Sequence, residues 1–255
     1  MPAFYAHYRF GKQLIPQLPA EVRQCIQRFR RMYDMGLQGP DIFFFHNPVM
    51  KTPIRDLSAK FHGQTGQEIF TDICGRVTSE AAKAYVYGLL AHYCLDSACH
   101  PFVQKKADSG EAGHVALEAE FDRYLLEQDG ISAPHTHDLS QRIHLTRGEC
   151  MTVAEFYPPS TGGDISRCLR IMAVMHKMSA SKNRRRTESL LKRLKPSLCD
   201  GLIPEEGSEF YARLDSELLL RYNRAMKRYP ELLTQLRNFM KHNEPLGEEF
   251  SSDFG

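Results

Sequence analysis

The chain has 255 residues, of which 42% are hydrophobic and 25% are charged, a balance that excludes disordered and fibrous architectures. Lys and Arg number 33 against 31 Asp and Glu, and the resulting net charge of +2 excludes a strongly basic protein that coats nucleic acid. The length is sufficient for a sizeable hydrophobic core without disulfide bonds.

The sequence shows no signal for insertion into a membrane or transport across one. No run of eighteen apolar residues occurs, so we expect no transmembrane segment. Residues 1–7 lack the basic and apolar regions of a signal peptide, and we therefore expect a cytoplasmic protein. The seven cysteines have no CxxC pair and no regular spacing, and we interpret them as reduced and mostly buried.

The first part of the chain shows a helical pattern followed by a turn. Apolar residues recur at helical spacing between Pro19 and Gly36, which predicts a helix in this interval. The pair Gly39-Pro40 predicts a turn, and the short apolar run of residues 41–45 follows it.

Two helices are predicted in the middle of the chain. Ser79 is a favourable N-cap for a long helix over residues 80–98. Pro101 is expected to end this helix, because the residue before a proline avoids the helical conformation. A second helix is expected over residues 111–127.

The remaining chain is predicted to alternate between loops and helices. Residues 131–163 are rich in Pro, His, Thr and Gly and are expected to form loops, and a helix is expected over residues 165–178. A pair of helices is expected on the two sides of Pro230, and the polar tail of residues 243–255 is expected to be frayed. Nothing indicates strands or a glycine-rich nucleotide motif. We therefore predict one all-α domain over residues 1–255.

Side chains that can bind metal share one face of the predicted long helix. His92, Asp96 and His100 are spaced by four residues, so they project in nearly the same direction. Leu89 and Leu95 are apolar neighbours, so this face is not simply the solvated side. Burying two imidazoles and a carboxylate without partners is costly, and a metal ion would satisfy all three.

A second pair with the same spacing lies on the following predicted helix. The pair is His114 and Glu118, and the short connection allows the two helices to be antiparallel neighbours. Imidazole and carboxylate together suit zinc, with iron or manganese as poorer candidates. One such pair alone is more often a hydrogen-bonded pair, whereas three ligands followed by a second pair favour a metal site. His7, Asp41 and His62 are further candidates upstream.

The order of these residues resembles the bacterial zinc-dependent phospholipase C family, which is related to the fungal zinc-dependent single-strand nucleases. The resemblance covers residues 1–126 and implies an all-α fold of this phospholipase C and nuclease type. It rests on His7, Gly39-Pro40-Asp41, His62, the segment Ala84-Tyr85-Val86-Tyr87-Gly88-Leu89-Leu90-Ala91-His92-x3-Asp96-x3-His100, and His114-x3-Glu118.

The resemblance also implies a centre of two or three zinc ions. The implied ligand sets are Asp41, His62, His92 and Asp96 for one ion, Asp96 and His7 with the N-terminal amine and carbonyl for another, and His100, His114 and Glu118 for the third. If Met1 is removed, the amine belongs to Pro2, at the short spacing from His7 that the family shows.

The implied reaction is hydrolysis of a phosphodiester bond. Zinc lowers the pKa of bound water to about 7, and two zinc ions that share Asp96 would hold the resulting hydroxide in line with a phosphorus atom. Asp96 and Asp41 are therefore the predicted catalytic residues. The third zinc would neutralise charge on the phosphate and on the leaving oxygen.

The substrate class stays open at this point. A phospholipid substrate with peripheral membrane contact, a nucleic acid or small phosphodiester at the same site, and a non-catalytic helical protein that binds metal are all compatible with these residues. The basic cluster of residues 182–195 could attract anionic lipid or nucleic acid, but we interpret it as a solvated face.

Overall fold

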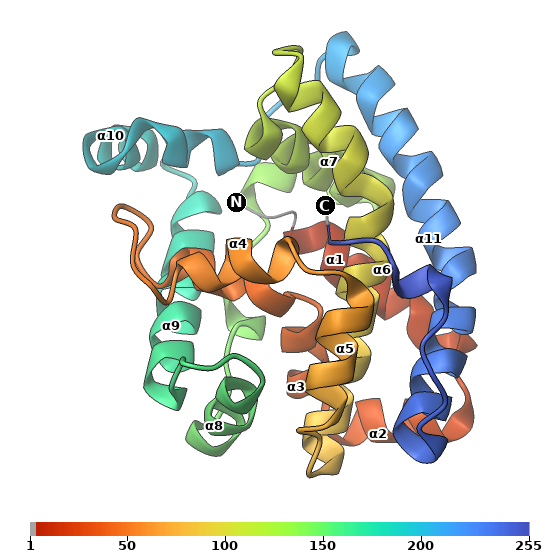
Figure 1. Cartoon of the computed structure of the whole chain (residues 1–255). Coiled ribbons are helices and arrows are strands. Elements are labelled where there is room, and N and C mark those ends of the chain that lie inside the picture. Colours follow the sequence, from red (N-terminus) through yellow and green to blue (C-terminus); the bar gives the residue numbers. More distant parts are fainter. Residues whose placement is uncertain (1–3, 255) are drawn as a thin grey trace.

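The computed structural model describes residues 4–254, and within this range it consists of helices and turns without a β-strand (Figure 1). The predicted all-α class is therefore confirmed. The α-helices, in chain order, are α1 Phe4–Leu14, α2 Ala20–Arg28, α3 Arg30–Gly36, α4 Asp56–His62, α5 Gly66–Cys74, α6 Glu80–Asp108, α7 His114–Gln128, α8 Arg147–Phe156, α9 Gly162–Ser179, α10 Arg184–Leu194 and α11 Glu209–His242. The short 3-10 helices are η1 Ile15–Gln17, η2 Gly39–Phe45, η3 Pro134–Thr136, η4 Ser140–Arg142, η5 Pro196–Gly201 and η6 Glu248–Phe250.

Helix α6 forms the centre of the fold. Residues 84–96 of this helix are buried on every side, because α1, α2, α3, α7 and α11 all pack against it. A helix that is apolar around its whole circumference is stable only where neighbours cover all of it. Figure 1 shows α11 along one side of the molecule and α8 and α9 on the opposite side. The metal-ligating face predicted from the sequence therefore lies in the interior.

The helices α6 and α3 approach each other at two glycines. A Cβ atom on Gly88 would lie 2.2 Å from the backbone oxygen of Tyr33, and one on Gly36 would lie 2.1 Å from the backbone oxygen of Tyr85. Both distances are far below van der Waals contact, so only glycine permits this packing. The close approach brings the segment that follows α3 against the middle of α6.

Two prolines that were expected to separate helices lie inside them. Helix α6 continues through Pro101 to Asp108, and α11 runs without interruption through Pro230. A proline within a helix costs about 3 kcal/mol. Packing offsets this cost, because Val103 is buried after the first proline and Leu233 after the second.

Two other helix boundaries also differ from those predicted. The helix expected between Pro19 and Gly36 is divided at Phe29, whose backbone leaves the helical conformation. The stretch of residues 131–163 contains α8 as well as loops, and this helix begins with a capping box made by Thr146 and Glu149.

The C-terminal tail is packed onto the protein, in contrast to the frayed segment expected from its polar composition. The side chains of Phe250 and Phe254 are fully buried. The backbone N–H group of Gly66 donates a hydrogen bond to Ser252, and that of Phe254 donates one to His62. These contacts hold the tail beside α4, α5 and α6, in the middle of the molecule (Figure 1). The two aromatic side chains outweigh the polar residues around them.

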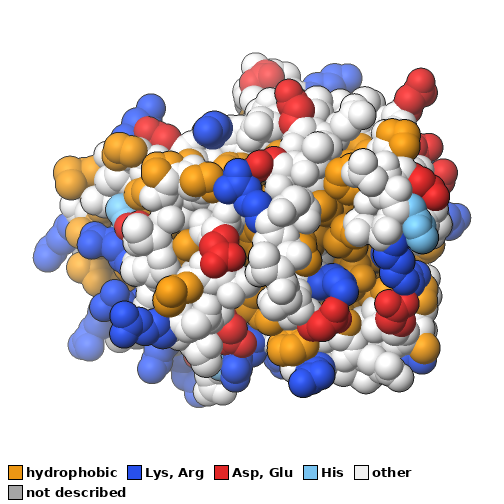
Figure 2. Space-filling view, turned by 60° about the horizontal axis from the view of Figure 1, so that its bottom comes forward, with side chains coloured by type: hydrophobic (Ala, Val, Ile, Leu, Met, Phe, Trp, Pro, Cys, Tyr) orange, Lys and Arg blue, Asp and Glu red, His pale blue; other side chains and the backbone are white. Residues whose placement is uncertain are grey.

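No helix among residues 4–254 is long and apolar enough to cross a membrane. On the face shown in Figure 2, acidic and basic side chains are interspersed among uncharged ones, and basic side chains gather at one edge. This distribution agrees with the small net charge of the whole chain.

Candidate metal centre

Eight of the nine predicted ligands lie together around the middle of α6. The ninth, Pro2, is outside the described residues. Three overlapping groups have ligand atoms within 4.8 Å of one another: His7, Asp41, His92 and Asp96; His62, Asp96 and His100; and His100, His114 and Glu118. The residues spaced by four on α6 and α7 therefore lie close together, as their spacing predicts. The fold brings His7, Asp41 and His62 beside them.

Asp96 lies at the centre of this arrangement, and only 3% of its surface is exposed. One carboxylate oxygen lies 3.1 Å from Nε2 of His7. The other lies 3.0 Å from Nε2 of His92 and 3.6 Å from Nε2 of His62. The two oxygens of this carboxylate thus face imidazoles from three different helices, and Asp96 belongs to two of the three groups of candidate ligands.

A second carboxylate organises the part of the centre between α6 and α7. Oε1 of Glu118 lies 3.2 Å from Nε2 of His100 and 3.3 Å from Nε2 of His114. The His100 ring also connects the two parts, because its Nδ1 atom is 3.9 Å from Asp96. The centre is thus continuous from α1 to α7.

Asp41 reaches the centre because of the turn that precedes it. Gly39 has a φ angle of +47°, which favours glycine, and a Cβ atom there would lie 2.8 Å from the His92 ring. Both the backbone conformation and the close contact therefore require glycine at this position. Pro40 follows in the first turn of η2, and this turn directs Asp41 inward, so that its carboxylate lies 3.2 Å from Nε2 of His62.

Backbone carbonyl groups fix the orientation of three of the imidazole rings. The Nδ1–H groups donate as follows: His62 to Ser58 at 2.7 Å, His92 to Leu37 at 3.1 Å and His100 to Phe254 at 2.9 Å. In each neutral ring the lone pair is then on Nε2, the atom that faces the carboxylates. The space between Nε2 and the carboxylate oxygens then suits either a proton on the ring or a bound cation, and metal-binding histidines are commonly oriented in this way.

Several buried polar atoms of the centre lack a hydrogen-bond partner among the described residues. They include Nδ1 of His7, Nε2 of His92 and Oδ2 of Asp96. Leaving such atoms unpaired in the interior is costly, and a bound ion removes that cost for the last two. The donor set of imidazole nitrogens and carboxylate oxygens fits zinc.

The electrostatic environment also favours positive charge among the carboxylates. Burial alone would raise the pKa of Asp96, but the charges of His100, His92 and His7 hold it well below its usual value. Burial lowers the pKa of His100, yet the charge of Asp96 and the hydrogen bond to Glu118 raise it to about 10. The carboxylates therefore stay ionised, as metal ligands must be.

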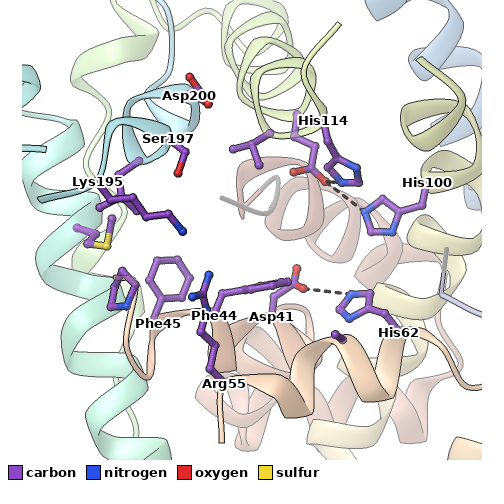
Figure 3. A pocket seen from close by; sticks show the side chains of 16 residues that line it. Asp41, Phe44, Phe45, Arg55, His62, His100, His114, Lys195, Ser197 and Asp200 are labelled. Atoms are coloured by element: carbon purple, nitrogen blue, oxygen red, sulfur yellow. Dashed lines mark hydrogen bonds and ion pairs between the residues drawn. The ribbon is translucent and has the colours of Figure 1, made fainter. Parts of the chain in front are cut away.

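A cavity of about 360 Å³ opens beside the ligands (Figure 3). The ligands Asp41, His62, His100, His114 and Glu118 form one wall, and apolar side chains that include Phe44, Phe45 and Met175 form much of the rest.

Two cations that could not be assigned to the site from the sequence, Arg55 and Lys195, also line this cavity. Arg55 belongs to no motif. Lys195 was part of the basic cluster interpreted as a solvated face, but it lines the cavity and is only half exposed, whereas Lys192 and Arg193 are exposed.

Fold and site together define an all-α protein with a buried centre of histidines and carboxylates beside a cavity. A model of the family described as zinc dependent phospholipase C matches residues 6–158, a range that contains all eight described ligand candidates. The chain belongs to this family. Comparison with curated proteins gave no match, and comparison with solved structures gave none either.

Proposed function

We propose that this protein is a zinc-dependent hydrolase that cleaves phosphodiester bonds of phospholipids. The observation that carries the proposal is the convergence of ring nitrogens from α1, α4 and α6 on Asp96, beside a cavity with apolar walls. Membership of the zinc dependent phospholipase C family supports the same chemistry.

We assign the ligands to as many as three ions. The sets are Asp41, His62, His92 and Asp96; Asp96 and His7 with the N-terminal amine, which is that of Pro2 if Met1 is removed; and His100, His114 and Glu118. The last assignment is supported by the short distances among its ligand atoms, which all lie within 4.8 Å.

Bound zinc supplies hydroxide at neutral pH, because it lowers the pKa of water from about 15.7 to about 7. The carboxylate of Asp41 lines the cavity and can accept the proton of the attacking water. Asp96 holds the imidazoles of α1, α4 and α6 around one point, and backbone carbonyls fix the orientation of the His62 and His92 rings. Such pre-organised groups require little rearrangement during the reaction.

The walls of the cavity favour a lipid substrate with peripheral membrane contact. Phe44 and Pro48 line the cavity, and the adjacent Val49 and Met50 are 43% and 62% exposed. We propose that this loop contacts the lipid surface, since exposed apolar side chains next to a binding cavity commonly mark such a contact.

The test is the metal content of the purified protein, measured by elemental mass spectrometry without added metal. We expect two or three zinc ions per chain. The Asp96→Asn variant should lose zinc and hydrolyse bis(p-nitrophenyl) phosphate more slowly, because the loss of a bridging carboxylate disturbs two ions.

The matched control is Asp72→Asn, which changes an exposed carboxylate on α5. This variant should keep its zinc and its activity. A single zinc that remains in Asp96→Asn would indicate a structural metal, and a protein that binds no metal under any loading condition would contradict the proposal.

A further inference from the structure

The cavity contains two cations that the proposed hydrolysis does not use. Arg55 lies just before α4, and Lys195 lies between α10 and η5, so they come from distant parts of the chain. Both side chains are half-buried, and neither forms an ion pair or a side-chain hydrogen bond within residues 4–254. Figure 3 shows both charged groups pointing into the space that faces Asp41, His62 and His100.

The carboxylates nearby do not neutralise these cations. Asp41 and Glu118 are engaged with histidines. Asp200 also lines the cavity but is exposed, and in Figure 3 it lies beyond Ser197, away from the tip of Lys195. Partly buried charges without partners are costly, so their presence in a binding cavity points to an anionic ligand.

The position of the cations indicates which part of a substrate they meet. The metal ligands form one wall, where the phosphodiester undergoing cleavage must lie, and the rings of Phe44 and Phe45 line the same cavity. A second anionic group on the same substrate would reach Arg55 and Lys195. Arginine matches phosphate with two parallel hydrogen bonds, and lysine adds a point charge.

We propose that the cavity selects phospholipids whose head group carries a second anionic group, such as a phosphomonoester, which Arg55 and Lys195 bind. This specificity rests on the proposed phosphodiesterase function. A head group with a quaternary ammonium is positively charged, so these two side chains would repel it. The apolar walls favour a lipid over a nucleic acid as the source of the anionic group.

The experiment compares short-chain lipids that differ by one phosphate. The zinc-loaded full chain is assayed below micelle formation with dioctanoyl phosphatidylinositol 4-phosphate, dioctanoyl phosphatidylinositol and dioctanoyl phosphatidylcholine. We expect kcat/KM to be highest for the phosphorylated lipid. Arg55→Gln and Lys195→Met should each reduce that preference about tenfold to a hundredfold, as expected for a lost charge-assisted hydrogen bond. Lys192→Met, an exposed neighbour on α10, should leave it unchanged.

A binding measurement separates the specificity from the proposed reaction. Calorimetry should show that inositol 1,4-bisphosphate binds more tightly than inositol 1-phosphate, and that the two variants remove the difference. If all three lipids are hydrolysed equally by the wild type and by both variants, the specificity is wrong while the function stands. If bisphosphate binding depends on these residues but no lipid is cleaved, the function is wrong while the anion site stands. A preference for pTpT over TpT that exceeds the lipid preference would overturn the lipid assignment.

Discussion

Asp215 is a single carboxylate in an environment that opposes its charge. It lies on α11 with no exposed surface, and neither oxygen has a hydrogen-bond partner among the described residues. The nearest cation is Nη2 of Arg123, at 4.0 Å. Burial and the charge of Glu120 raise the pKa of Asp215 to about 7. The folded protein therefore binds a proton at this residue more tightly than the unfolded chain does.

The pH dependence of stability follows from that difference. The unfolded pKa of Asp215 is near 3.8, so its contribution is most favourable at low pH and is lost as the pH rises from about 4 to about 7. Asn cannot ionise, so the Tm of Asp215→Asn relative to wild type should increase between pH 5 and pH 8. Thermal melts across this range test the prediction, with Asp72→Asn as control. A difference in Tm that is constant with pH would contradict it.

At the residue scale, sequence spacing predicted the shared face of the candidate ligands on α6. It did not predict which groups orient the rings or which cations line the cavity. The interval of four residues brought His92, Asp96 and His100 to one face because helix geometry alone determines it. The carbonyl groups that orient the rings could not be predicted, since any residue supplies one. Arg55 and Lys195 were also missed, because an isolated cation carries no pattern until the fold places it in a cavity.

At the scale of elements, the contact between α3 and α6 positions one ligand of the centre. The two backbones touch at Gly36 and Gly88, and the turn that follows α3 carries Asp41. Any widening of this contact must move Asp41 away from α6. Packing between α3 and α6 therefore contributes to the position of a candidate metal ligand.

We expect Gly88→Ala to destabilise the protein by about 1–3 kcal/mol, because the added methyl group overlaps the backbone of Tyr33. Gly148→Ala is the matched control, since nothing lies within 4 Å of a Cβ atom at that position of α8. The control should be neutral or more stable by up to about 1 kcal/mol, owing to the better helix propensity of alanine. Equilibrium unfolding in urea measures both. Equal stability of the two variants would refute the close contact.

The sequence predicted helices as the type of element, but the helix ends expected at two prolines were wrong. The expected ends at Pro101 and Pro230 followed from local backbone chemistry, which disfavours proline within a helix. Burial of the residues that follow each proline reverses this preference, and burial depends on partners far away in the sequence. The helix α8 was not predicted, although Thr146 and Glu149 form a capping box that can be recognised in the sequence.

At the scale of the whole molecule, the C-terminal tail completes the environment of the centre. The ring of Phe254 lies 5.8 Å from that of His62 and 5.7 Å from that of His92, and its carbonyl accepts the hydrogen bond from His100. The polar composition of residues 243–255 concealed this role, because two buried aromatic side chains decide the packing of the segment.

Two variants of the tail separate stability from metal binding. Phe254→Ala and Phe250→Ala both remove a fully buried ring and should each cost about 3–5 kcal/mol. Only Phe254 contacts the ligand histidines, whereas Phe250 packs on Tyr93 and Phe70. We therefore expect zinc affinity to fall about 10–100-fold in Phe254→Ala and less in Phe250→Ala. Competition with a chelating dye, at a temperature where both variants are folded, measures this; equal affinities would show that the tail acts through stability alone.

The span of the centre along the chain has a consequence for biosynthesis. Its ligands begin at His7, and the carbonyl that orients His100 comes from Phe254. Domains that fold during translation do so as their residues leave the ribosome, in order from the N-terminus. A nascent chain cannot complete this centre until residue 254 has emerged, so a ribosome-bound intermediate exposes imidazoles and carboxylates in an unfinished arrangement. We therefore expect the candidate ligands to reach their final arrangement only after the segment around Phe254 has packed against His100.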